Sequence, residues 1–140
     1  MVYVCRKEYF SAAHKLYNPN WSKEKNCEVF GVCANDHWHG HNFELIVTVK
    51  GKPAEDTGYV IDLKQLGLII QEKIIQKVHH KNLNDDVPFL KGMMPSCENL
   101  AIAFWKEIFE PIRKASPAAT LHCIELVETK KNIVKYYGEE

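Results

Sequence analysis

Residues 39–49 read His-Gly-His-Asn-Phe-Glu-Leu-Ile-Val-Thr-Val, and this alternation of polar and apolar residues predicts a β-strand. Side chains two apart in a strand lie on the same face, so the imidazoles of His39 and His41 share the face of the apolar Phe43. Two neutral imidazoles at this spacing supply part of a zinc site. Gly40 leaves the opposite face bare, so another group can approach the backbone closely there. We therefore expect a metal site at the start of this strand.

The hydrophobic pattern along the chain predicts six main elements in the order ββααββ. They are strands at 2–13 and 39–51, a helix capped by Asp62 with apolar residues spaced three and four apart up to Val78, a helix capped by Ser96 that ends before Pro111, and strands at 119–128 and 132–138. A short extended piece is expected at 59–61. Residues 15–38 show neither period, and a connection of that length in a compact domain is usually functional. The order predicts one α+β domain over 1–140, an antiparallel sheet with two helices on one face.

The composition argues against several classes of protein. Eighteen basic residues balance eighteen acidic ones, so no net charge favours a nucleic acid as the partner. No apolar run reaches the length of a membrane span, and the first ten residues lack the apolar core of a signal peptide. The five cysteines are scattered without a Cys-x-x-Cys pair, which favours a reducing cytoplasm over a disulfide framework. The open edges of the predicted sheet favour assembly into an oligomer.

A catalytic zinc needs a third protein ligand, and the candidates are His14, His37 and His122. His37 alternates with His39 and His41, but residues four apart on a strand are separated by about 13 Å, too far to converge on one ion unless the chain bends. His14 ends the first strand, which pairs beside the second, so we expect it to join His39 and His41. The alternative is that all three are unrelated, half-buried histidines that bind backbone groups.

A cysteine, two histidines and two glutamates are further candidates for the chemistry. Cys33 lies in the long loop six residues before the His-Gly-His motif, and a thiol near zinc has a lowered pKa that makes it a usable base. The alternative for Cys33 is a small apolar side chain packed under the loop. His79 and His80 follow the first helix, whose dipole favours an imidazolium that transfers protons near neutral pH; the alternative is a solvent-facing pair. Glu125 and Glu128 are expected on the third main strand, and a single buried carboxylate facing the metal cleft would suit a cationic or amide-like group of a ligand.

Taken together, these residues match a known pattern. The chain resembles the 6-pyruvoyl tetrahydropterin synthase family, which includes the bacterial 6-carboxytetrahydropterin synthases of queuosine biosynthesis. The resemblance runs from Tyr3 to Gly138, and its joint order and spacing are highly specific. The motifs that carry it are Phe10-Ser11-Ala12-Ala13-His14, Cys33 followed at six by His39-Gly40-His41-Asn42-Phe43, His80-Lys81-Asn82-Leu83-Asn84, Glu98-Asn99, and Glu128-Thr129 before Asn132-Ile133-Val134.

The resemblance implies a fold, an assembly and a reaction. The fold would be the tunnelling fold, in which a ββααββ unit assembles into an oligomeric barrel, a homohexamer of two trimers with active sites between subunits. The substrate would be 7,8-dihydroneopterin triphosphate, which loses its triphosphate. A zinc ion would be held by His14, His39 and His41. The sequence gives no support for a magnesium requirement.

The resemblance also implies roles for individual side chains. Cys33 would be the general base, and His80 its proton-transfer partner. Glu128 would anchor the amino-pyrimidine edge of the pterin. Ser96 and Cys97 stand where the family often has Thr-Thr or Thr-Ser beside the pterin, so we expect them to line the substrate site.

One position departs from the family pattern. His79 stands where the family usually has an Asp that orients the following histidine and stabilises its charged form. A neutral imidazole makes one hydrogen bond there but supplies no negative charge. We therefore expect a lower pKa for His80 than in the family, with proton transfer slowed or routed through Asp85 or Asp86.

Three functions are consistent with this sequence. The first is a zinc-dependent lyase that forms 6-pyruvoyl-tetrahydropterin, because the six-residue spacing from Cys33 to His39 resembles that branch of the family. The second is a 6-carboxytetrahydropterin synthase, which acts on the same substrate and releases acetaldehyde. The third is a non-catalytic zinc-binding or pterin-binding protein that retains the site without the usual Asp.

Overall fold

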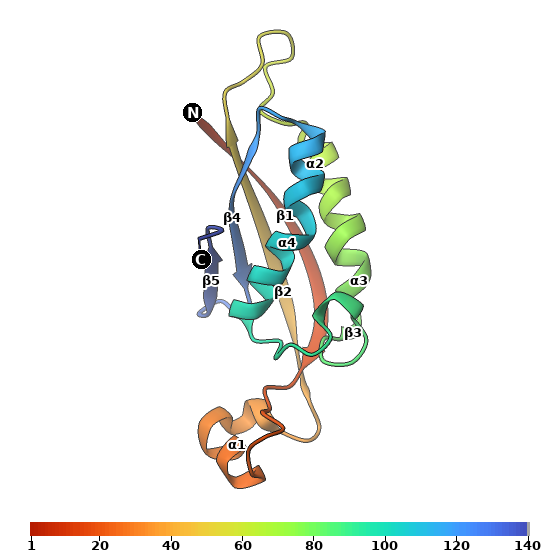
Figure 1. Cartoon of the computed structure of the whole chain (residues 1–140), viewed down its shortest axis with the longest axis vertical. Helices are drawn as coiled ribbons and strands as arrows, with labels where there is room; N and C mark the ends of the chain where they lie inside the picture. The colour runs from red at the N-terminus through yellow and green to blue at the C-terminus, as the bar shows by residue number, and fades with distance from the viewer. Residues whose placement is uncertain (140) are drawn as a thin grey trace.

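A computed structural model describes residues 1–139, and its long elements follow the predicted ββααββ order (Figure 1). The strands are β1 (Val2–His14), β2 (His39–Gly51), β3 (Lys81–Asn82), β4 (Thr120–Val127) and β5 (Ile133–Tyr136). The α-helices are α1 (Lys23–Phe30), α2 (Leu63–Ile70), α3 (Gln76–Val78) and α4 (Cys97–Ala115). A π-helical segment at Gln71–Ile75 joins α2 to α3, and short 3₁₀-helices lie at Gly31–Ala34 and Pro88–Leu90.

The five strands form one sheet in the order β3-β1-β2-β4-β5. All pairs are antiparallel except β3 with β1, which run parallel over two residues. Helices α2, α3 and α4 cover one face of the sheet and leave the other bare (Figure 1). The expected α+β architecture is therefore confirmed, with β3 as a short addition at one edge.

The strand alternation decides which face becomes the core. On β2, the side chains of Phe43, Leu45, Val47 and Val49 are at most 1% exposed, so the predicted apolar face is the helix-covered face. Phe10 of β1 stacks on Phe43, with ring centroids 4.7 Å apart. The histidines that share this alternation therefore lie on the core side, at the end of the sheet where β1 ends and β2 begins.

The second layer begins where the sequence predicts it. The carboxylate of Asp62 accepts a hydrogen bond from the backbone N–H of Lys64 at 2.9 Å and so caps α2. Leu66, Ile70 and Ile74, each four residues after the one before, are fully buried in the core. The π-helical segment adds a residue to one helical turn, and Ile74 within it still packs in the core.

One expectation about the helices was wrong. Helix α4 does not end before Pro111 but continues to Ala115. Proline removes one backbone donor from a helix, yet Ile108 and Ile112 on either side of it are fully buried, and their packing keeps the chain helical. The stretch 59–61 forms no strand; it leads into the Asp62 cap.

The long connection 15–38 is also more ordered than its pattern predicts. It contains α1, which is capped by Ser22, and the following 3₁₀ turn. The side chain of Asn26, which is fully buried, holds the loop together: it accepts from the backbone N–H of Asn18 at 2.7 Å and donates to the Asn18 carbonyl at 3.0 Å. A polar residue thus organises this segment, which is why hydrophobic periodicity did not reveal it.

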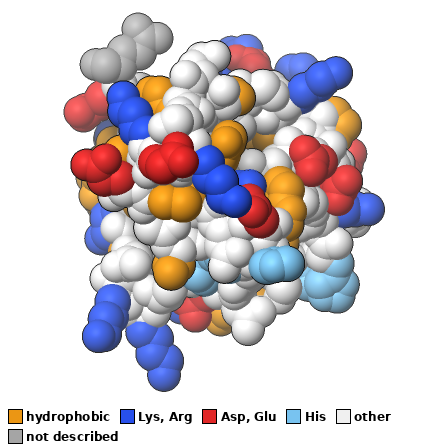
Figure 2. All heavy atoms as spheres, turned by 90° about the horizontal axis from the view of Figure 1, so that it is seen from below, with side chains coloured by type: hydrophobic (Ala, Val, Ile, Leu, Met, Phe, Trp, Pro, Cys, Tyr) orange, Lys and Arg blue, Asp and Glu red, His pale blue; other side chains and the backbone are white. Residues whose placement is uncertain are grey.

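The surface agrees with the balanced composition. On the face that Figure 2 shows, acidic and basic side chains are interspersed and do not gather into a patch of one sign. None of the helices within residues 1–139 is long and apolar enough to span a membrane.

Candidate functional site

Three histidines converge where β1 and β2 meet. The strand register pairs His14 with His39 and places His41 opposite Ala12, so all three imidazoles project to the core side. Their candidate ligand atoms lie within 4.8 Å of one another, and this group could hold a metal ion. His37 is exposed and takes no part in the group, while the His122 ring packs against Tyr3, with centroids 4.8 Å apart.

The nitrogens of this cluster lack the partners that buried nitrogens usually have. The Nδ1 of His14 lies 2.8 Å from the carbonyl oxygen of Pro95, which can only accept, so Nδ1 donates and Nε2 is left with its lone pair. That Nε2, both ring nitrogens of His39 and the Nε2 of His41 are buried without a hydrogen-bond partner. Burial lowers the pKa of His14 and of His39, which favours the neutral ligand form. Three imidazoles with unpartnered nitrogens at this separation suit a zinc ion that keeps a fourth position open.

A carboxylate and a thiol lie beside the histidines. The Oε1 of Glu128 is 3.0 Å from the Nε2 of His41, although the angle is not that of a hydrogen bond. The other oxygen, Oε2, accepts a hydrogen bond from the Cys97 thiol at 2.6 Å. Burial, and then the nearby Glu128 carboxylate, strongly raise the pKa of Cys97. Cys97 therefore remains a protonated thiol that donates to Glu128.

A cavity of about 470 Å³ brings most of the predicted site residues together. Its lining includes His14, Cys33, Ser96, Cys97 and Glu128, with Lys131 at the β4–β5 turn. Cys33 is half-buried in the 3₁₀ turn after α1, and its carbonyl accepts a hydrogen bond from the Leu16 N–H at 2.8 Å. This bond ties the loop to the end of β1 and so places the thiol in the same cavity as His14.

Ser96 serves the fold at this site as well. Its Oγ accepts a hydrogen bond from the Asn99 N–H at 3.3 Å and caps α4, as its position before the apolar spacing predicts. The same cap places Cys97, the first residue of α4, against Glu128. The sequence gives no signal for the Pro95 carbonyl that orients His14. Every residue has a backbone carbonyl, so residue type does not reveal which one accepts the bond.

His79 and His80 lie elsewhere, and the structure does not bring them to Cys33. Both are exposed, at the turn between α3 and β3, and their rings stack with centroids 3.8 Å apart. The Nδ1 of His79 accepts a hydrogen bond from the Ser11 N–H at 3.0 Å. The Asp86 carboxylate accepts from the backbone N–H of Asn82, not from His80.

We predict that the chain binds one Zn²⁺ at the histidine cluster and that the bound ion raises its melting temperature. Replacing His39 with Ala removes a ligand, so the affinity should fall by more than the roughly 100-fold that outer-shell changes cause. Isothermal titration calorimetry with zinc measures both stoichiometry and affinity.

The matched control is His37→Ala, because His37 is close in sequence but lies outside the cluster. This variant should retain wild-type affinity. Loss of zinc binding in His37→Ala, or undiminished binding in His39→Ala, would contradict the assignment.

Known proteins with this architecture identify the family. The family model for 6-pyruvoyl tetrahydropterin synthase matches residues 3–139. The 6-pyruvoyl tetrahydrobiopterin synthase of Dictyostelium discoideum is 39% identical over 138 residues, 99% of this chain and 97% of that protein. The Homo sapiens protein of the same name is 39% identical over 136 residues, 97% of this chain and 91% of that protein. The solved structure of Caenorhabditis elegans 6-pyruvoyl tetrahydropterin synthase superposes with a TM-score of 0.86 at 35% identity, covering 99% of this chain and 96% of that one. The chain therefore belongs to the 6-pyruvoyl tetrahydropterin synthase family.

Proposed function

We propose that this chain is a zinc-dependent lyase that converts 7,8-dihydroneopterin triphosphate to 6-pyruvoyl-tetrahydropterin with loss of triphosphate. The observation that carries the proposal is the histidine cluster with unpartnered nitrogens, opening into a cavity that also holds a thiol and a carboxylate. The names of the similar proteins from Dictyostelium discoideum and Homo sapiens support the product.

The two thiols of the cavity have different roles in this proposal. When bound, zinc would polarise a side-chain oxygen of the substrate and so acidify the neighbouring C–H bond. The base that removes this proton is Cys33, because a thiolate is the reactive form and Cys97 is kept protonated by burial and by Glu128. Cys97 instead donates to Oε2 of Glu128.

Glu128 orients the pterin. Its carboxylate accepts two parallel N–H bonds from the amino-pyrimidine edge, which fixes the ring in register with the histidine cluster. One carboxylate oxygen lies at His41 and the other at Cys97, so the ring is held between the metal side and the start of α4. Ser96 lines the same wall.

The position of His80 requires a second copy of the chain. The sheet separates it from Cys33, so His80 can act as a proton-transfer partner only in the cavity of a neighbouring subunit. Exposed apolar side chains on the bare face and at its end, among them Tyr3 and Tyr9 at 53% and 59% exposure, are suited to burial in such an assembly. We infer a homohexamer of two trimers, with each active site completed by its neighbour.

Product analysis tests the proposed reaction. Zinc-loaded protein incubated with 7,8-dihydroneopterin triphosphate should release triphosphate and form a pterin with a pyruvoyl side chain, while Cys33→Ala should lose at least about 100-fold in rate. Acetaldehyde among the products would instead mark the 6-carboxytetrahydropterin branch. Zinc and pterin binding without release of triphosphate would identify a non-catalytic protein.

Mixing two inactive variants tests the shared site. Cys33→Ala and His80→Ala each lack one essential group, so each should be inactive alone. Subunits exchanged between them should regain part of the wild-type rate, because some interfaces then combine an intact Cys33 with an intact His80. A mixture that exchanges subunits, as followed by native mass spectrometry, yet stays inactive would place both groups in one chain's site.

The His79 position offers a prediction about rate. Asp in place of His79 can still accept the Ser11 N–H, and its negative charge would stabilise the imidazolium of His80. His79→Asp should therefore raise turnover by about three- to ten-fold and shift the basic limb of the pH–rate profile upward. His79→Asn is the control, because it accepts the same bond without charge and should give no increase. Equal rates in all three proteins would show that this position does not limit catalysis.

A further inference from the structure

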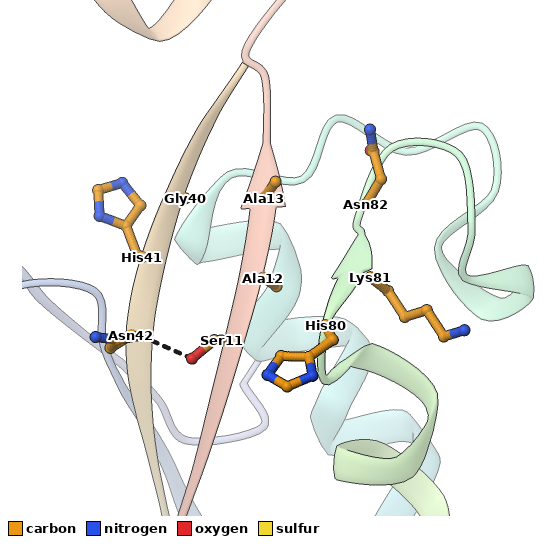
Figure 3. A pocket seen from close by; sticks show the side chains of 9 residues that line it. All are labelled: Ser11, Ala12, Ala13, Gly40, His41, Asn42, His80, Lys81 and Asn82. Atoms are coloured by element: carbon orange, nitrogen blue, oxygen red, sulfur yellow. Dashed lines mark hydrogen bonds between the residues drawn. The ribbon is translucent and has the colours of Figure 1, made fainter. Parts of the chain in front are cut away.

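Trp38, the residue directly before the candidate metal ligand His39, has a backbone conformation that few bulky residues adopt. Its φ is +62°, in the left-handed region, where the Cβ of an L-residue crowds the neighbouring carbonyl. In the part of the chain that the structure describes, the other non-glycine residue with a positive φ is His80, at +59°. The His80 N–H donates to the Ser11 carbonyl of β1 at 2.7 Å, beside the pocket that Figure 3 shows, so a bond to the sheet holds that conformation. The Trp38 N–H instead donates to the Asn35 carbonyl at 3.1 Å, within its own loop.

His39 is a ligand of the cluster whose ring no hydrogen bond orients. The His14 ring donates from Nδ1 to the Pro95 carbonyl at 2.8 Å, which fixes its orientation. Both ring nitrogens of His39 are buried without a hydrogen-bond partner among the described residues. Histidines that bind metals usually donate their second nitrogen to a neighbouring acceptor, which holds the ring in place. The orientation of the His39 ring therefore depends on its packing against His14 and His41 and on the backbone that leads into it.

The half-buried indole of Trp38 is anchored by Lys15. The Lys15 ammonium lies 5.8 Å from the centroid of the Trp38 ring and 4.6 Å from that of Tyr17, within the range of cation–π contacts. The side chain of Lys15 is only 15% exposed, and shielding from water strengthens such contacts. The same ammonium donates to Oδ1 of Asp36, two residues before Trp38, at 3.4 Å. Lys15 thus holds this end of the loop through an aromatic ring and a carboxylate.

Lys15 is itself held in a fixed position. Its backbone N–H donates to Oδ1 of Asn84 at 2.9 Å, and its carbonyl accepts from Nδ2 of the same side chain at 2.9 Å. Lys15 directly follows His14, and Trp38 directly precedes His39, which is the last pair in the register of β1 and β2. The contact between Lys15 and Trp38 therefore links the two strands just beyond the sheet, at the end that carries the metal ligands.

We propose that Trp38 is a positioning residue for His39: the indole, held by Lys15, keeps the backbone before β2 in the left-handed conformation that aims the His39 ring at the metal position. The proposal rests on the proposed function only in taking zinc as the ion. In this role Trp38 contacts neither substrate nor metal. It holds in place a ring that no hydrogen bond orients, so its loss lowers the affinity for zinc without removing a ligand.

Zinc affinity, measured by isothermal titration calorimetry on the full-length protein, tests this role. Trp38→Ala removes the indole but retains a Cβ, so the backbone should leave the left-handed region and the dissociation constant should rise roughly 10- to 100-fold. Trp38→Gly also removes the indole, but glycine adopts a positive φ without a steric penalty, so it should bind zinc at least about three-fold more tightly than Trp38→Ala. Loss of packing alone would not make glycine better than alanine.

Further variants separate the Lys15 contact from general damage to the loop. Trp38→Phe retains an aromatic face over Lys15 and should stay within about three-fold of wild type, whereas Lys15→Met should weaken zinc binding by roughly three- to ten-fold. The matched control is Trp21→Ala. Trp21 lies in the same connection with the Lys25 ammonium 4.3 Å from its ring centroid, but its φ is outside the left-handed region. This variant should retain zinc affinity within about two-fold of wild type.

Several results would overturn the proposal. Wild-type zinc affinity in folded Trp38→Ala would do so, as would an affinity in Trp38→Gly no better than in Trp38→Ala, or an equal loss in Trp21→Ala. If Trp38→Ala does not fold, Lys15→Met decides, because wild-type affinity in that variant would remove the anchor on which the role depends. A changed oligomeric state by native mass spectrometry with unchanged zinc affinity would assign Trp38 to a subunit contact instead.

Release of triphosphate by the zinc-loaded wild type distinguishes this proposal from the proposed function. If triphosphate is released but zinc affinity does not depend on Trp38, only the positioning role is wrong. If zinc affinity follows the expected order but no triphosphate is released, Trp38 positions a metal ligand and the proposed reaction is wrong. A wild type that binds no zinc would overturn both.

Discussion

The register between β1 and β2 is the constraint on which the rest of this structure depends. The two strands pair over 13 residues, from Val2 with Gly51 to His14 with His39, without a bulge. Because side chains alternate along a strand, a slip of one residue would turn one strand's histidines to the bare face and expose its apolar residues. The burial of Phe10 and Phe43 therefore stabilises the arrangement of the metal cluster as well as the core.

The cluster itself is costly for the fold. Each buried nitrogen without a partner costs about 1–3 kcal/mol, and four such atoms lie within three side chains. Burial of apolar side chains in the adjoining core offsets this cost, and a bound cation would reduce it by taking one nitrogen from each of the three histidines. The Pro95 carbonyl and the Cys97–Glu128 hydrogen bond hold neighbouring groups in place around the cluster. Polar atoms that lack hydrogen-bond partners in the unbound chain but are held in a fixed orientation, like these ring nitrogens, are typical of a binding site.

The two faces of the sheet divide the proposed chemistry. The histidine cluster and the cavity lined by Cys33 and Glu128 lie at the helix-covered face, and His80 lines a separate pocket with Ser11 and Gly40. A chain built in this way cannot bring its own thiol and its own His80 together, so the proposed reaction depends on assembly. The short edge strand β3 matters here, because it pairs with Ala12 and Ala13 of β1, and the His80 N–H just before it donates to the Ser11 carbonyl at 2.7 Å.

The sequence determined the features that follow from periodicity and local chemistry. Alternation gave the long strands and the shared face of His39 and His41, and Asp62 and Ser96 marked the helix starts, because capping is decided by residues close in the chain. Only the tertiary structure decided the rest. Helix α4 passes through Pro111 because of packing at Ile112, and α1 depends on the buried Asn26, which no periodic pattern reveals. The separation of His80 from Cys33 arises from strand order, which pairs residues that are distant in sequence. Local patterns do not encode such pairings.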